Sequence, residues 1–86
     1  METQNIRIMG ILITDRVKEA GDVQAVLTAH GGVIKSRLGL HETEENNNRK
    51  GLILLELCGD NQEKEMLEKD LSALEGVMVQ RMDFEV

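Results

Sequence analysis

The sequence predicts an α+β fold with the element order β-α-β-β-α-β. Four apolar runs have the length of strands, two segments between them have helical spacing, and glycines stand where the elements end. We expect strands over Asn5–Ile13, Val33–Leu40, Leu52–Cys58 and Val77–Val86, one helix between Thr14 and His30, and one over Asn61–Leu74. This order is typical of the ferredoxin-like arrangement, a four-stranded antiparallel sheet with both helices on one face and the first and third strands at its centre.

The first strand is apolar on both faces apart from Arg7. A strand with one face in water alternates apolar with polar residues, so both faces of this one should be covered. We expect helices on one face and another subunit on the other. The apolar interface away from the helices is predicted to contain Met9, Ile11, Ile13, Leu52 and Leu54, with Arg7, Lys35, Arg37 and Glu56 among them.

The first helix has two possible starts. Thr14 or Asp15 can cap it, and Gly21-Asp22 is a second start that would leave residues 16–20 as a loop or loose turn. Gly31-Gly32 ends it. The residues with helical spacing inside it are Val23, Val26, Leu27 and His30.

The second helix has clearer signals. Asp60 is its predicted cap, Leu67, Leu71 and Leu74 form its apolar stripe, and Gly76 follows its end.

Two parts of the remaining strands matter for the sheet faces. In the second strand, Ile34, Leu38 and Leu40 are expected to share a face with Ser36. In the last strand the even and odd positions are both apolar, so its facing is left open. The polar segment His41–Lys50 is predicted to be an exposed hairpin tip.

Composition bounds the function. The 86 residues form a single domain, 1–86, whose own core leaves little stability to spare, which favours association. A net charge of −6 and a single aromatic residue, Phe84, argue against direct contact with nucleic acid. No apolar run approaches the ~20 residues of a membrane span, and no signal peptide is recognisable, so we expect a cytoplasmic protein without membrane contact.

Catalytic and metal chemistry have weak signals. His30, His41 and Cys58 are possible metal ligands, but their spacings of 11 and 17 match no known ligand pattern, so no metal site is assigned. Ser36 and Ser72 lie in no nucleophile motif, so no catalytic residue is assigned and we do not expect an enzyme. No cofactor is indicated.

Four residues are candidates for ligand binding. Arg37 suits a carboxylate or phosphate, or alternatively an intersubunit salt bridge to Glu56. Asp15 and Arg16, after the central strand, could hold a ligand or simply begin the helix. His41, at the start of the polar segment, completes the set.

Several short motifs also resemble a known family. They are Ile8-Met9-Gly10-Ile11, Thr14-Asp15-Arg16, Ser36-Arg37-Leu38-Gly39-Leu40, Gly51 before an apolar strand, and Leu74-Glu75-Gly76-Val77. Over nearly the whole chain they resemble the small family of regulators assigned to the iron-only (FeFe) hydrogenase system. That family is similar to ACT-like domains and to the C-terminal domain of the nickel-responsive repressor.

The resemblance implies a ferredoxin-like domain that forms homodimers or homotetramers through its sheet and responds to a small ligand. Asp15-Arg16 is followed by Val17-Lys18 where the ACT ligand turn has a glycine, and no paired histidines precede Cys58 as in the nickel repressor. The expected function is therefore a ligand-sensing regulatory module that acts through another protein. A protein–protein adaptor without a small-molecule ligand is the alternative, and a metal-binding module is a third.

Overall fold

A computed structural model of the chain describes residues 5–40 and 50–85, with the side chains of residues 16–19 left out. Its elements are β1 (Asn5–Ile13), α1 (Arg16–Ala29), a short 3-10 turn (Gly31–Val33), β2 (Ile34–Leu40), β3 (Gly51–Leu57), α2 (Asn61–Ser72) and β4 (Val77–Glu85). The predicted element order is confirmed. The predicted hairpin tip after Leu40 falls almost wholly outside the described residues.

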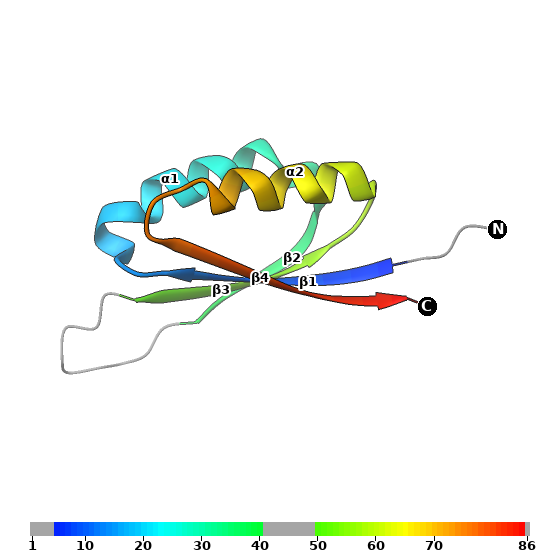
Figure 1. Cartoon of the computed structure of the whole chain (residues 1–86), viewed down its shortest axis with the longest axis horizontal. Helices are drawn as coiled ribbons and strands as arrows, with labels where there is room; N and C mark the ends of the chain where they lie inside the picture. The colour runs from blue at the N-terminus through cyan, green and yellow to red at the C-terminus, as the bar shows by residue number, and fades with distance from the viewer. Residues whose placement is uncertain (1–4, 41–49, 86) are drawn as a thin grey trace.

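The four strands form one antiparallel sheet in the order β2-β3-β1-β4. The first and third strands are central, as the sequence predicts. Figure 1 shows α1 and α2 side by side on one face of the sheet, with no helix on the other face. The fold is therefore the ferredoxin-like α+β arrangement.

The side chains of β1 face the opposite way from the prediction. Met9, Ile11 and Ile13 are 0%, 0% and 3% exposed, and they lie in the core against the helices. Their prediction as residues of the face away from the helices is wrong. Both faces of β1 are apolar, so its own sequence does not determine which one the helices cover.

Strand pairing shows how the core is assembled. Met9 is opposite Leu55 of β3, and Ile11 lies between Ile53 of β3 and Val79 of β4. Residues opposite each other on neighbouring strands project to the same face, so these side chains form one apolar layer. The helices close it with Val23 and Leu27 of α1 and Leu67 and Leu71 of α2.

Helix α1 begins at Arg16 and continues through Gly21 without a break. The alternative start at Gly21-Asp22 is therefore wrong. Gly21 borders open space, so it costs the helix about 1 kcal/mol relative to alanine without disturbing any packing. Thr14 ties the start of α1 to the end of α2, because its hydroxyl and its backbone N–H both donate to the carbonyl oxygen of Gly76, at 3.0 and 2.9 Å.

Helix α2 begins and ends where its sequence signals predict. The Asp60 carboxylate accepts a hydrogen bond from the backbone N–H of Gln62 at 3.0 Å, so Asp60 is the N-cap. Regular helix ends at Ser72, two residues before the predicted Leu74. Gly76 then has φ = 77°, a conformation that glycine adopts without strain, and the chain turns into β4.

An irregularity in β2 changes the predicted facing of Ile34. The register with β3 shifts between Ile34 and Ser36, so Ile34 is opposite Leu57 on the covered face while Ser36 is opposite Glu56 on the other. Ile34 accordingly packs against the core. The prediction that Ile34 shares a face with Leu38 and Leu40 is wrong for this reason.

The position of Met9 can be tested by truncation. Met9→Ala should lower the free energy of unfolding by about 2–5 kcal/mol, because it leaves a cavity in a closed core. The matched control is Met66→Ala on the outer side of α2, where Met66 is 54% exposed and the change should stay within about 0.5 kcal/mol. Urea unfolding measures both, and equal effects would contradict the described core.

Candidate functional site

The face of the sheet without helices is the most distinctive surface of the molecule. We call it the open face and define it by strand pairing. Exposed large apolar residues gather there from all four strands: among the described residues, seven of the eight lie on it, and the eighth is Met66 of α2. The open face consists of Ile6, Ile8, Gly10, Leu12, Ser36, Leu38, Leu40, Leu52, Leu54, Glu56, Met78, Gln80, Met82 and Phe84.

The open face is large for a chain of this size. Its seven exposed apolar residues are between 37% and 57% exposed. At roughly 180 Å² for a large apolar residue, these fractions amount to about 600 Å² of apolar surface. That is the upper end of the largest patches on monomeric proteins, and it approaches the ~800 Å² that each partner contributes to a stable interface.

Leu52 and Leu54 lie on the open face, where the sequence places them. From β1, however, the residues on this face are Ile6, Ile8, Gly10 and Leu12, in place of the predicted Met9, Ile11 and Ile13. The uncertain alternation of β4 is also explained. Val77 and Val79 face the helices, while the more apolar even positions face outward.

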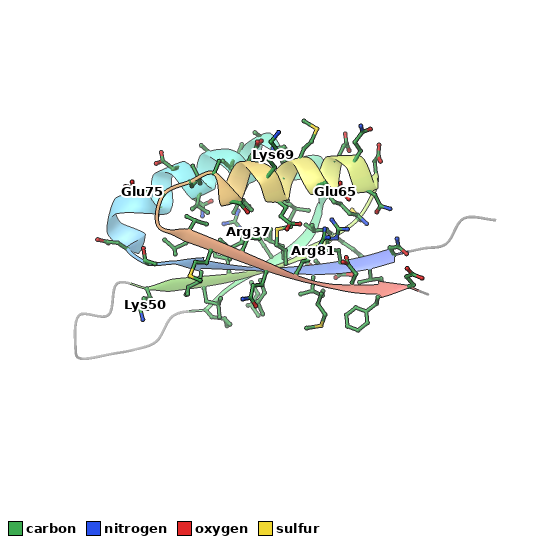
Figure 2. All side chains as sticks on the ribbon, viewed as in Figure 1. Arg37, Lys50, Glu65, Lys69, Glu75 and Arg81 are labelled. Carbon is green, nitrogen blue, oxygen red and sulfur yellow. The ribbon has the colours of Figure 1, made fainter. Side chains whose placement is uncertain are left out.

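A charged cluster lies on the covered side, at the end of the sheet where β1 begins and β4 ends. Arg7 is only 8% exposed, and its Nε donates to Oδ1 of Asp83 on β4 at 2.6 Å. Arg81 bonds Glu68 of α2 at 3.2 Å and Asp83 at 3.5 Å. Figure 2 shows Arg81 reaching from β4 toward α2. The cluster therefore joins β1 and β4 to α2.

The cations of this cluster act together on Asp83. The hydrogen bond from Arg7 holds the pKa of Asp83 below its ordinary value of 3.8. Burial opposes this shift, whereas the charges of Arg7, Arg81 and Lys64 all reinforce it. Asp83 is thus ionised in neutral solution and partly balances a group of three cations.

Of the four predicted ligand-binding residues, Arg37 is the best defined. Its Nη2 donates to Oε1 of Gln24 on α1 at 3.0 Å, so it lies on the covered side of the sheet, as Figure 2 shows. Its predicted placement on the same face as Glu56 is wrong. Arg37 is opposite Leu55, which faces the helices, whereas Glu56 is on the open face. Glu56 is instead bonded by Ser36 at 3.1 Å and approached by Lys35 at 3.7 Å.

Asp15 and Arg16 lie apart from Arg37. Asp15 precedes α1, and Arg16 is the first residue of that helix. The strand position level with Arg37 is Met9, about 13 Å along β1 from Ile13, where β1 ends. His41 lies outside the described residues. The structure thus does not bring Arg37 together with the Asp15-Arg16 turn.

The residues considered as metal ligands also lie apart. The His30 ring is 2.7 Å from Oδ2 of Asp70 on α2, and Cys58 follows β3. Over the described parts of the chain, no three histidine, cysteine or acidic side chains converge as a metal site would require.

Two residues of the charged cluster were not recognised from the sequence as site candidates. Lys64 is 2% exposed although it lies on a charged helix, and Asp83 pairs with a residue 76 positions away. The available signal was Arg7, a single charge in an apolar strand. Its partner could be identified only from the register of β1 with β4.

The fold and surfaces define a class: a small ferredoxin-like domain with one bare, apolar sheet face. No protein-family profile matches the chain. No curated protein matches it either. Neither helix in the described parts of the chain is long and apolar enough to cross a membrane.

Solved structures with a similar fold match nearly the whole chain. An uncharacterised protein, TM1266 from Thermotoga maritima, is 25% identical with a TM-score of 0.81, covering 96% of this chain and 99% of that one. CPII from Thiomonas intermedia K12, a nitrogen regulatory PII-like protein bound to ADP, AMP and bicarbonate, is 11% identical with a TM-score of 0.65, covering 99% and 93%. CPII bound to ADP, AMP and acetate is 12% identical with a TM-score of 0.60, covering 100% and 92%. At such identities the CPII likeness shows the fold.

The shifted pKa of Asp83 gives a pH prediction. Because its folded pKa is lowered, its contribution is complete above the unfolded value near 3.8 and is lost as pH falls through the folded value. Asp83→Asn should therefore lower the urea midpoint at pH 7, and the difference from wild type should shrink below pH 3.8. Asp22→Asn, an exposed control on α1, should leave the midpoint at pH 7 unchanged. A constant difference for Asp83→Asn across the range would contradict the charged pairing.

Proposed function

We propose that this protein is a homo-oligomeric regulatory module that senses a small ligand and associates through its open face. The observation that carries the proposal is the open face itself: about 600 Å² of apolar surface contributed by every strand. Exposure of apolar surface to water is unfavourable, and a second copy of the chain has an apolar surface of the same size that can cover this one. In this arrangement the sheet is buried on both sides, which agrees with the apolar sequence of both central strands.

The likeness to regulatory proteins supports the ligand-sensing part. CPII, which shares the fold, is a nitrogen regulatory PII-like protein bound to ADP and AMP. We infer a regulatory role without catalysis, in the cytoplasm, for this chain as well. A link to the iron-only hydrogenase system is the finer proposal, and it rests on the motif resemblance alone.

A protein–protein adaptor is the second candidate. The same open face favours it, because an apolar face can be covered by a different protein as well as by a second copy. The two functions differ in what the purified chain does alone. An adaptor without its partner is a monomer, whereas the proposed module is an oligomer.

A charge placed on the open face tests the association. Wild type should be a dimer or larger by light scattering, and Met82→Asp should be a folded monomer, because the carboxylate would be buried without a partner at the interface. Met66→Asp is a matched control, since Met66 and Met82 are 54% and 57% exposed on opposite sides of the molecule. It should keep the wild-type mass. A monomeric wild type, or a Met82→Asp protein of unchanged mass, would contradict the interface.

Native mass spectrometry of freshly purified protein tests the sensing role. We expect an oligomer with a reproducible added mass of a small molecule, lost after denaturation and refolding and restored by the identified compound. An oligomer that binds none of a panel of nucleotides and small carboxylates would contradict the sensing role, and a ligand-free monomer would argue for the adaptor.

A further inference from the structure

A groove of about 960 Å³ opens at the end of the sheet where β1 begins, β3 ends and α2 begins. This volume lies in the range of small-molecule sites. In Figure 1 this end lies at the right, beside the start of α2. The lining side chains with charged or amide groups are Asn5, Lys35, Glu56, Asp60, Asn61 and Lys64.

Lys64 is a buried charged residue that lines this groove. Its side chain is 2% exposed, and its ammonium donates to the carbonyl oxygen of Asn5 at 3.4 Å. That distance is beyond the usual 2.7–3.2 Å, and an ammonium has three protons to donate. A buried ammonium is normally paired more closely than this. Lys64 therefore retains capacity for an anionic partner.

Two neighbouring polar atoms are also unsatisfied. The side-chain Oδ1 of Asn5, a residue that lines the groove, and Nη1 of Arg7 are buried without a hydrogen-bond partner. Arg7 is opposite Leu57, which also lines the groove. Unpaired buried polar atoms cost about 1–3 kcal/mol each, so a ligand that pairs with the Asn5 amide would recover part of that cost.

The charges nearby bear on which kind of ligand would fit here. Arg7, Lys64 and Arg81 all act on Asp83, and the carboxylates bonded to this group are Asp83 and Glu68. Among the bonded groups three cations meet two carboxylates, and Glu85 is a further acid at this end, opposite Asn5 on β4. The acids of the groove itself are already engaged, since Glu56 is bonded by Ser36 and approached by Lys35, and Asp60 caps α2.

We propose that this groove binds a small oxyanion, a carboxylate or a phosphate group, with Lys64 as its principal contact. The amide of Asn5 turns to donate to the same anion, and Arg7 raises the positive potential from beneath without touching it. The start of α2 adds its partial positive charge in the same direction. This inference rests on the proposed ligand-sensing function and names the ligand class.

The test is thermal unfolding in chloride, acetate and inorganic phosphate at equal ionic strength. Wild type should show a saturable rise in Tm with phosphate or acetate relative to chloride, because a ligand that binds only the folded state stabilises it. A rise with acetate alone identifies a carboxylate site, and a rise with phosphate alone identifies a phosphate site. Equal Tm values in all three salts would overturn the proposal.

Lys64→Met provides the matched substitution, because methionine keeps the volume and removes the charge. In chloride its Tm should equal or exceed that of wild type, since a buried, poorly paired charge is removed. Its anion affinity should fall about tenfold to a hundredfold. Lys69→Met, an exposed control on the same helix, should keep wild-type affinity.

An unchanged anion response in Lys64→Met would overturn the site. If Lys64→Met does not fold, Asn5→Ala gives the same reading through a severalfold loss of affinity. The outcome is separable from the proposed function: a reproducible ligand in native mass spectrometry without any oxyanion response would keep ligand sensing and remove this site.

Discussion

The whole structure depends on the pairing of β1 with β3 on one side and β4 on the other. This register turns Met9, Ile11 and Ile13 toward the helices and leaves Ile6, Ile8, Gly10 and Leu12 outward. A shift of one residue would exchange the two sets. Because both sets are apolar, the exchange costs little hydrophobic burial within one chain. The observed register brings Arg7 of β1 opposite Asp83 of β4, where the two side chains form a hydrogen bond of 2.6 Å.

The sequence contains enough to predict the elements, their order and the position of α2. Asp60, the leucines of the α2 stripe and Gly76 are local signals, and local signals are readable without a partner. The face of the sheet to which a side chain projects depends, in contrast, on how its strand pairs with its neighbours. Met9 and Ile8 are both large apolar residues, so the sequence does not show which of them faces the helices. Ile34 turns inward because the pairing of β2 with β3 is irregular, and no residue type in β2 predicts that irregularity. Lys64 was missed for the same reason, since its hydrogen-bond partner, Asn5, is 59 positions away in the sequence.

The two faces of the sheet have different roles. The covered face is closed by α1 and α2 and contains the core, while its charged end contains the buried cations Arg7 and Lys64. The open face has nearly the same apolar character and no helix over it (Figure 2). Among the described residues, no element covers the open face. For an 86-residue domain with one aromatic residue, association is the most direct source of the missing burial.

The open face and the groove share two residues. Ile6 and Glu56 line the groove and also belong to the open face. A substitution at either one changes both surfaces, so its effect on ligand binding cannot be separated from its effect on association. Lys64 lies on α2, on the opposite side of the sheet from the open face. It lines the groove and does not belong to the open face. Met82 lies on the open face and outside the groove. A substitution at Lys64 or at Met82 therefore changes only one of the two surfaces. The shared residues, in turn, give a direct physical route by which an anion in the groove would affect association.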